Sequence, residues 1–387
     1  MKIIYASCLC SKEKFADLFK DSDKMPGQQV QKYHRLIVEG LIENNIDVQV
    51  VTVLPITRMN CKRIYLKREQ EVNNEIKYYY LPILNIPVLK NIISLINSFW
   101  YVFIKCFRNR NYCVIGDVLN ISACAGALCA AKILKIRNIG IVTDIPSLLS
   151  KNKNSLSVKI STQLISSFDS YVFLTENMNG LVNKKGKPYL VIEGQVDINM
   201  RDFENEFNGK HDKKICIYAG GLQKIYGIGI LVDAFLLANV ENAELHLYGN
   251  GDFEDELKEI CRKHTSIRYF GVMPNDYIVS EEIKATLLIN PRPTSEEYTK
   301  YSFPSKNMEY MASGTSVLST KLLGMPEEYY PYVFLIEDES VEGLAKALRN
   351  VLSMDPAKLH ENGLRAKEFV IKEKNNVIQA SKILRLF

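Results

Sequence analysis

Residues 215–227 read ICIYAGGLQKIYG, and this stretch determines the class of fold. Its first residues are β-branched, aromatic and apolar, which predicts a buried strand over 215–219. Two glycines follow before an apolar helical pattern at 229–238. Glycine lets a backbone approach another group closely, and the helix after it presents its positive end at the same place. The stretch therefore predicts a strand, a turn and a helix of a parallel α/β domain, with space for a phosphate at the turn.

Working outward, short β-rich runs alternate with helical patterns along the whole chain, which is typical of βαβ units and a parallel sheet. The predicted elements are strands at 2–7, 48–54, 114–116, 140–143, 171–175, 215–219, 244–248 and 285–290, with helices at 28–44, 229–238 and 254–263. The charged stretch 196–214 lacks apolar periodicity and is interpreted as a linker. We therefore expect two doubly wound domains, residues 1–198 and 199–361.

The composition limits the class of protein. The length of 387 residues is more than one ordinary domain core needs. The composition, 47% apolar and 24% charged, is that of a globular protein. The net charge of +5 is mild, so no nucleic-acid partner is expected. The nine cysteines are odd in number and scattered, and they indicate reduced core residues with no metal site. The apolar run at the N-terminus is too short for a signal peptide. We expect a cytoplasmic protein.

Residues 81–111, LPILNIPVLKNIISLINSFWYVFIKCFRNRN, form a long segment with an apolar core in the first domain. Only about 14 residues separate Lys90 from Lys105, fewer than the roughly 18 that a spanning helix needs. Aromatic rings followed by cations suit the interface of a bilayer. Two interpretations remain open: a peripheral contact through 86–110 with the inner face of the cell membrane, and a core helix that ends in a solvated basic turn.

Predicted ligand-binding residues follow the strands of the second domain, because ligands of parallel sheets bind at the carboxyl ends of strands. Gly220 and Gly221 are interpreted as a diphosphate cradle. Lys224 is a candidate for balancing the charge of the diphosphate, and the alternative is a solvated loop lysine. Backbone groups after two further strands can face a nucleobase, at Gly249, Val272 and Met273.

The segment FPSKNMEYMASG, residues 303–314, predicts a helix that begins near Pro304, where a missing N–H costs little. Ser305 and Lys306 then lie at the positive end of the helix, which suits phosphate oxygens. Glu309 follows one turn later on the same side, and its carboxylate can accept hydrogen bonds from a ribose diol. The alternative is an ordinary Lys-Glu pair at the surface.

In order and spacing, YAGGLQKIYG, LYGNGD, YFGVMP and FPSKNMEYMASGTSVLST resemble the retaining GT-B glycosyltransferases of family 4. The likeness is strongest to the bacterial branch that builds capsule, exopolysaccharide and O-antigen. It implies two Rossmann-like domains that face a central cleft, with a helix at 362–386 packed back on the first. The donor would bind the C-terminal domain, and Asp144 of the acceptor domain would face the cleft. The resemblance implies metal-independent catalysis without a cofactor, because basic groups and helix ends neutralise the leaving diphosphate.

The chain departs from the family pattern at three positions. Tyr301 stands where many members have a glutamate, Gly221 where an arginine is usual, and Tyr226 where a lysine is usual. We expect Lys224 and Lys306 to replace the missing cations, and Glu297 to replace the missing carboxylate. Tyr301 and the neighbouring Ser302 remain among the expected donor-binding residues.

The resemblance implies transfer of a hexosyl group from a nucleotide-sugar donor to a sugar hydroxyl, with retention at the anomeric carbon. The expected acceptor is a lipid-linked oligosaccharide. The expected catalytic residues are Lys306, Lys224, Glu297 and Asp144. Two alternatives remain: a GT-B sugar-nucleotide epimerase, and a catalytically silent partner that binds nucleotide or lipid.

Overall fold

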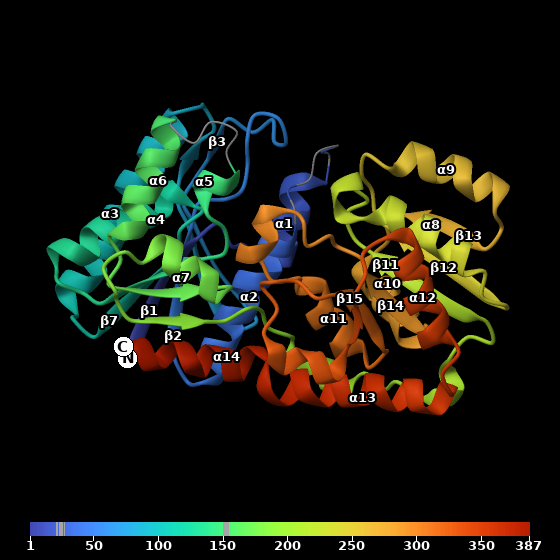
Figure 1. Ribbon diagram of the computed structural model, residues 1–387. Helices are drawn as coiled ribbons and strands as arrows, with labels where there is room; N and C mark the ends of the chain where they lie inside the picture. Colours follow the sequence, from blue (N-terminus) through green and yellow to red (C-terminus); the bar gives the residue numbers. More distant parts are fainter. Residues whose placement is uncertain (21, 23–25, 27, 150–154) are drawn as a thin grey trace. The chain divides into compact units, whose positions relative to one another are not determined.

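The chain divides into two units by its internal contacts. Unit 1 comprises Met1–Glu193 and Asn376–Phe387, and unit 2 comprises Gly194–Asn375. The computed structural model describes residues 1–20, 22, 26, 28–149 and 155–387. In both units the apolar strands are buried on both faces, as expected of parallel sheets covered by helices. Figure 1 shows the helices and strands of each unit.

The sheet of unit 1 has the strand order β10-β9-β8-β7-β1-β2-β5-β4. Its neighbouring strands are parallel except for β4, which runs antiparallel to β5, and a separate antiparallel pair joins β3 to β6. The strands are β1 (Lys2–Ser7), β2 (Asp47–Thr52), β3 (Tyr65–Leu66), β4 (Glu69–Asn73), β5 (Ile76–Tyr80), β6 (Ile83–Leu84), β7 (Tyr112–Asp117), β8 (Asn138–Val142), β9 (Ser170–Phe173) and β10 (Tyr189–Val191).

Helices cover both faces of this sheet and close its core. They are α1 (Lys12–Phe19), α2 (Gln28–Glu43), α3 (Leu89–Arg108), α4 (Ile121–Ile133), α5 (Pro146–Leu149), α6 (Leu156–Ser166), α7 (Glu176–Val182), α14 (Asn376–Ile383) and the 3-10 turn η6 (Leu384–Leu386). Among the helices of the described residues, none is both long enough and apolar enough to cross a membrane.

The sheet of unit 2 is parallel throughout, in the order β13-β12-β11-β14-β15-β16. The strands are β11 (Lys214–Ala219), β12 (Ala243–Tyr248), β13 (Ile267–Gly271), β14 (Leu287–Asn290), β15 (Val317–Thr320) and β16 (Phe334–Ile336). The order reverses between β11 and β14, and ligands of open α/β sheets bind at such a switch point. The glycine turn predicted from the sequence follows β11 and therefore lies at this point.

Two apolar clusters pack on the two faces of the second sheet. The helices and 3-10 turns of unit 2 are η1 (Ile198–Asp202), η2 (Phe207–Gly209), η3 (Lys224–Tyr226), α8 (Ile228–Ala238), α9 (Glu254–Lys263), α10 (Asn275–Lys284), η4 (Glu297–Tyr301), α11 (Ser305–Ser313), η5 (Glu327–Tyr332), α12 (Val341–Leu352) and α13 (Pro356–Glu373). The doubly wound α/β architecture predicted from the alternation of strands and helices is confirmed in each unit.

The limits of the two units differ from those expected from the sequence. The chain leaves unit 1 after Glu193 and returns at Asn376, whereas the expected boundaries were 198 and 362. The expected single helix is two helices, since α13 ends at Glu373 and α14 begins at Asn376. Two residues, Lys374 and Asn375, lie between them. The first is tied to unit 2, since the carbonyl of Lys374 accepts from the N–H of Val196 at 3.0 Å.

The two helices belong to different cores. Ala366 and Val370 of α13 are buried in the core of unit 2, whereas Ala380 and Ile383 of α14 are buried in the core of unit 1. Gly40 of α2 lets α14 come this close, because a β-carbon at Gly40 would lie 2.1 Å from the carbonyl oxygen of Asn376. Only α14 therefore returns to unit 1.

Candidate functional site

Three glycines end neighbouring strands at the carboxyl edge of the second sheet. The N–H of Gly220 donates to the carbonyl of Tyr248 at 2.9 Å, and the N–H of Gly249 donates to that of Gly271 at 2.7 Å. A β-carbon at Gly249 would stand 1.9 Å from the oxygen of Gly220, and φ of Gly249 is +122°. Only glycine permits this backbone at this spacing. The turns after β11, β12 and β13 thus form one continuous edge, as expected from the sequence.

Lys306 lies against the first of these turns. A β-carbon at Gly220 would stand 1.5 Å from Nζ of Lys306. Nζ donates to the hydroxyl of Tyr218 at 2.9 Å and lies 4.3 Å from the centre of that ring. Tyr218 in turn donates to the carbonyl of Gly221 at 2.8 Å. The structure therefore brings Gly220, Gly221 and Lys306 together, although they come from two distant segments.

The surroundings of Lys306 lower its pKa to about 7. Burial is the main cause, and the positive charge of Arg292 acts in the same direction, whereas Glu309 and Glu282 raise the pKa. Desolvation disfavours the charged ammonium, and a bound anion would favour it. The protonation of the Lys306 amine near neutral pH therefore depends on whether an anion lies beside it.

A buried polar network fixes the start of α11 above the sheet. The side chain of Asn307 accepts from Asn290 at 2.8 Å and donates to Ser319 at 2.9 Å. The hydroxyl of Tyr310 accepts from the N–H of Ala219 at 2.8 Å. These contacts reach the ends of β11, β14 and β15. The helix N-terminus is thereby held at the switch point.

Two predicted residues lie on the first turns of α11. Ser305 is exposed, and Glu309 is partly exposed. The carboxylate of Glu309 is close enough to Lys306 to raise its pKa. Both residues therefore share the helix end at which an anion would bind.

Arg292 is a second cation of the site, and sequence reasoning missed it. Its guanidinium carbon lies 4.8 Å from the centre of the Tyr226 ring and 5.8 Å from that of Tyr298. The Thr320 hydroxyl donates to its carbonyl at 2.5 Å. Tyr226 stands where the family usually has a lysine. The guanidinium of Arg292, which lies over the Tyr226 ring, places a positive charge near the position of that lysine. The available signal was an arginine two residues after a buried strand.

Lys224 does not join Lys306. Its ammonium forms an exposed ion pair with Glu256 of α9 at 2.7 Å, and its N–H donates to Asp252 at 2.7 Å. The hydrogen bond to Glu256 raises the pKa of Lys224. The turn directs this side chain to α9, as in a solvated loop lysine. The expectation that Lys224 helps to balance the diphosphate charge stays a prediction, and Arg292 is the cation whose charge acts on Lys306.

The segment before α11 carries the remaining predicted donor residues. Glu297 is exposed and Tyr301 is partly exposed, at the two ends of η4. Among the described residues, the buried hydroxyls of Tyr298 and Ser302 have no hydrogen-bond partner. Buried hydroxyls are normally hydrogen-bonded, to protein or to water. The segment therefore carries two hydroxyls that a polar ligand could satisfy.

The end of β13 holds the residues predicted to face a base. Gly271 has a positive φ of +71°, and Val272 after it is 69% exposed. Met273 is partly buried against one core cluster of unit 2. The hydrogen bond from the N–H of Gly249 to the carbonyl of Gly271 places the turn after β13 next to the turn after β12.

Asp144 follows β8 at the carboxyl edge of the first sheet. Burial, and then the charge of Asp117, raise its pKa to about 6. Asp117 ends β7, and its carboxylate lies 3.4 Å from Nε2 of His34. The other ring nitrogen of His34 is 2.6 Å from the hydroxyl of Tyr5. The first sheet thus carries its own group of titratable side chains at the edge where ligands bind.

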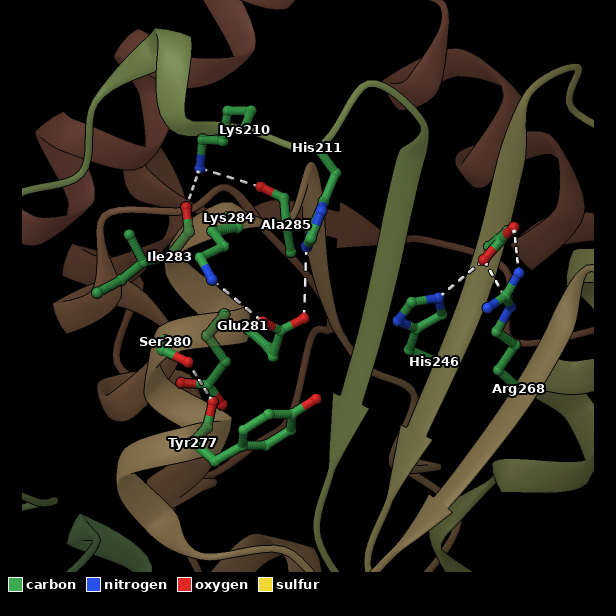
Figure 2. Close-up of polar contacts among 12 residues, drawn as sticks. Lys210, His211, His246, Arg268, Tyr277, Ser280, Glu281, Ile283, Lys284 and Ala285 are labelled. Carbon is green, nitrogen blue, oxygen red and sulfur yellow. Dashed lines mark hydrogen bonds and ion pairs between the residues drawn. The ribbon is translucent and has the colours of Figure 1, made fainter.

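Two further groups of polar contacts, which we call together the amino-end cluster, lie at the amino end of the second sheet (Figure 2). Glu244 at the start of β12 accepts from Arg268 at 2.9 Å and lies 3.0 Å from Nε2 of His246. Lys210 donates to the carbonyls of Ile283 and Ala285 at the end of α10. Cations there satisfy the last carbonyls of a helix. We interpret this cluster as structural, since it is at the edge opposite the glycine turns.

Comparison with known proteins identifies the domain that carries this site. Residues 213–354 match the family described as Glycosyl transferases group 1. The match covers the glycine turns, Arg292, Lys306 and Glu309. A search of curated proteins gives no match.

Solved structures resemble the chain over its whole length. Sucrose-phosphate synthase from Thermosynechococcus elongatus is 15% identical, with a TM-score of 0.66 over 100% of this chain and 98% of that one. The lipopolysaccharide outer core galactosyltransferase WaaB is 16% identical, with a TM-score of 0.65 over 100% and 99%. Anabaena HepE in complex with UDP-glucose is 14% identical, with a TM-score of 0.62 over 100% of both chains.

At these identities the similar structures show the fold, and the family match shows the class of the domain. They confirm the predicted GT-B fold and the predicted enzyme class. The chain thus has the GT-B fold, and its residues 213–354 match the glycosyl transferases of group 1.

Proposed function

We propose that this chain transfers a hexosyl group from a nucleoside diphosphate sugar to a sugar hydroxyl of a lipid-linked oligosaccharide, with retention, in the assembly of a bacterial surface polysaccharide. The observation that carries the proposal is that Lys306, at the start of α11, contacts the Gly220 turn that follows β11. A structure similar to this chain, Anabaena HepE, was solved in complex with UDP and with UDP-glucose. The group 1 domain supports the same class of reaction.

The diphosphate of the donor would lie on the Gly220 turn. There it would meet the ammonium of Lys306, the guanidinium of Arg292 and the N-terminus of α11. These groups would stabilise the charge that develops on the leaving diphosphate, and such electrostatic stabilisation often lowers the barrier more than any other effect. In this proposal no metal ion is required. Ser302 and Tyr298 offer unpartnered hydroxyls to the donor, and Glu309 would accept from the ribose.

The proposed chemistry needs no nucleophilic side chain. The bond from the anomeric carbon to the phosphate oxygen breaks as the acceptor oxygen bonds to that carbon from the same face. The proton of the acceptor hydroxyl passes to an oxygen of the leaving diphosphate. The protein supplies orientation and charge stabilisation. Asp144 of unit 1 would orient the acceptor hydroxyl, and Glu297 would face the sugar.

A thermal-shift panel of UDP, GDP, ADP and their common sugars tests the donor site, because a ligand that binds only the folded state raises its melting temperature. We expect one nucleotide series to stabilise the protein, and Lys306→Ala to abolish the stabilisation. Stabilisation by none of them would contradict the donor assignment.

Turnover with a lipid-linked acceptor separates the alternatives. Transfer that requires the acceptor supports the proposal. Isomerisation of the donor without any acceptor would instead indicate a sugar-nucleotide epimerase, and binding without turnover would indicate a silent partner. Glu297→Gln in the same assay tests the carboxylate, since full turnover in this variant would remove Glu297 from the mechanism.

A further inference from the structure

Helix α3 buries mainly small side chains and exposes several of its large apolar ones, while Phe99, Tyr101 and Phe103 pack partly against the core. The residues that it buries are Ser94, Ser98, Val102 and Cys106. Large apolar side chains recur every three or four residues along the exposed face, which we call the apolar stripe: Leu89, Ile92, Ile96, Trp100, Ile104 and Phe107. Trp100 is 54% exposed and Phe107 is 64% exposed. A helix that only completes a core has the opposite arrangement.

The neighbouring helix α4 explains this arrangement. Its sequence ISACAGALCAAKI is composed mainly of small residues, and a β-carbon at Gly126 would lie 2.2 Å from the carbonyl oxygen of Leu95. The hydroxyl of Ser98 donates to the carbonyl of Ala123 at 2.7 Å. The two helices lie side by side (Figure 1). They are too close to hold large side chains between them, so the large side chains of the stripe are exposed. The apolar stripe is therefore built into the packing of unit 1.

The sequence that carries the stripe is almost wholly positive in charge. Residues 76–143 contain a single acidic residue, the buried Asp117, against eight cationic ones: Lys77, Lys90, Lys105, Arg108, Arg110, Lys132, Lys135 and Arg137. Helix α3 leads into β7 and α4 leads into the parallel strand β8, so both helices end at the same edge of the sheet. The last five of these cations are exposed there, and Lys132 among them is paired with Asp169. We call them the cationic end.

We propose that the apolar stripe and its cationic end bind the surface of an anionic phospholipid bilayer. An interfacial helix of this kind places large apolar and aromatic side chains in the headgroup region, while its cations contact anionic headgroups. Charge complementarity favours this partner over a second copy of the chain, because two copies would bring surfaces of the same sign together. The inference does not rest on glycosyl transfer, since vesicle binding is measured without donor or acceptor.

Flotation of the full chain with vesicles tests the proposal. We expect binding to vesicles of phosphatidylcholine and phosphatidylglycerol at low salt, weaker binding at high salt, and little binding to phosphatidylcholine alone. The double variant Trp100→Gln, Phe107→Gln should lower the partition coefficient at least about tenfold, because each side chain loses apolar burial in the bilayer. Leu237→Gln is the matched control: this leucine of α8 is 49% exposed but lies in unit 2.

A second pair of variants tests the cationic end. Arg108→Gln with Lys135→Gln should lower binding to the anionic vesicles on the order of tenfold, and it should leave the weak binding to phosphatidylcholine unchanged. Lys346→Gln, at an exposed lysine of α12 in unit 2, should change neither. Near-UV circular dichroism and melting of every variant show that the fold is retained.

Three results would overturn the proposal. The first is an unmodified chain that does not float with anionic vesicles at low salt. The second is equal binding by the unmodified chain and the Trp100→Gln, Phe107→Gln variant. The third is a dimer in light scattering that this variant abolishes, with no vesicle binding by either protein, which would assign the stripe to a second copy.

Discussion

The ammonium group of Lys306 occupies the space beside Gly220 where any other residue would have its β-carbon, 1.5 Å from Nζ. The glycine and the lysine come from β11 and α11, and each restricts the other. The first residue of the turn has no side chain, and this leaves room for the ammonium of Lys306 at that place. This pair is the most direct target for mutation.

Gly220→Ala should displace Lys306 and strain the turn, because φ of Gly220 is +153°. We expect a loss of about 1–3 kcal/mol in the free energy of unfolding and at least about a tenfold loss of nucleotide affinity. Denaturant unfolding and calorimetric titration measure the two effects. Gly180→Ala is the control, because nothing lies within 4 Å of a β-carbon there. Equal affinities of the two variants would contradict the assigned contact.

Lys306→Ala should reduce turnover about 100- to 1,000-fold, because removing one charge stabiliser costs about 2.7–4 kcal/mol of barrier. Lys224→Ala should change turnover by no more than a few-fold, because Lys224 pairs with Glu256 at the surface. Initial rates under saturating donor compare the two alanine variants. A larger loss at Lys224 than at Lys306 would reverse the assignment.

Arg292→Ala should also reduce turnover, by about 100-fold, through loss of the second cation. Arg292→Lys should recover part of the rate, since it restores the charge but not the planar contact with Tyr226 and Tyr298. Arg262→Ala, at an exposed arginine paired with Glu259, serves as the control. Unchanged turnover in Arg292→Ala would exclude Arg292 from the site.

Binding of the nucleoside diphosphate should take up a proton near neutral pH. The pKa of Lys306 is lowered to about 7 in the free protein, and a bound diphosphate favours the charged ammonium and raises it again. Affinity should therefore fall as the pH rises above about 7. Calorimetric titration in buffers of different ionisation enthalpy counts the proton. The uptake should vanish in Lys306→Met, and an uptake that persists there would assign it to another group.

Asp144 should make the protein less stable at neutral pH than in mild acid. Its folded-state pKa is raised to about 6, above that of the unfolded chain, so the folded state binds more protons in between. The stability that the protonated Asp144 retains is fully present below the pKa of the unfolded chain, and it is lost as the pH rises through the pKa of the folded state. Asp144→Asn should therefore raise the free energy of unfolding at pH 7 by about 1–3 kcal/mol. Urea unfolding from about pH 4 to pH 8 measures this, and a parallel fall with pH in both proteins would exclude Asp144 as the source.

The strands and helices that were predicted from local sequence patterns lie within a few residues of their expected positions, because each depends on residues close together in the chain. The strand over 215–219, its glycine turn and the helix that starts near Pro304 all agree with β11, Gly220 and α11. The same local patterns placed Gly220, Gly249 and Lys306 at one edge of a parallel sheet. For these three residues, the local pattern and the sheet topology indicate the same position at the carboxyl edge of the sheet.

The neighbours of each charged side chain could not be read in this way. Lys224 follows the glycine turn as expected, yet its partner is Glu256 of α9. Arg292 lies beside Tyr226 because β14 is next to β11 in the sheet. The whole domain determines which strands become neighbours. The residues around a charged side chain at the end of one strand therefore do not indicate which side chain it contacts.

The α3 segment shows the same division. Its sequence determined an apolar helix with cations at its end, and it left open whether the large side chains complete a core or face outward. The small residues of α4 decided this, because Gly126 and Ala123 bring the two backbones so close that the large side chains of α3 cannot fit between them. Composition and periodicity determine which elements form, whereas the distance between packed elements determines which side chains remain available for binding.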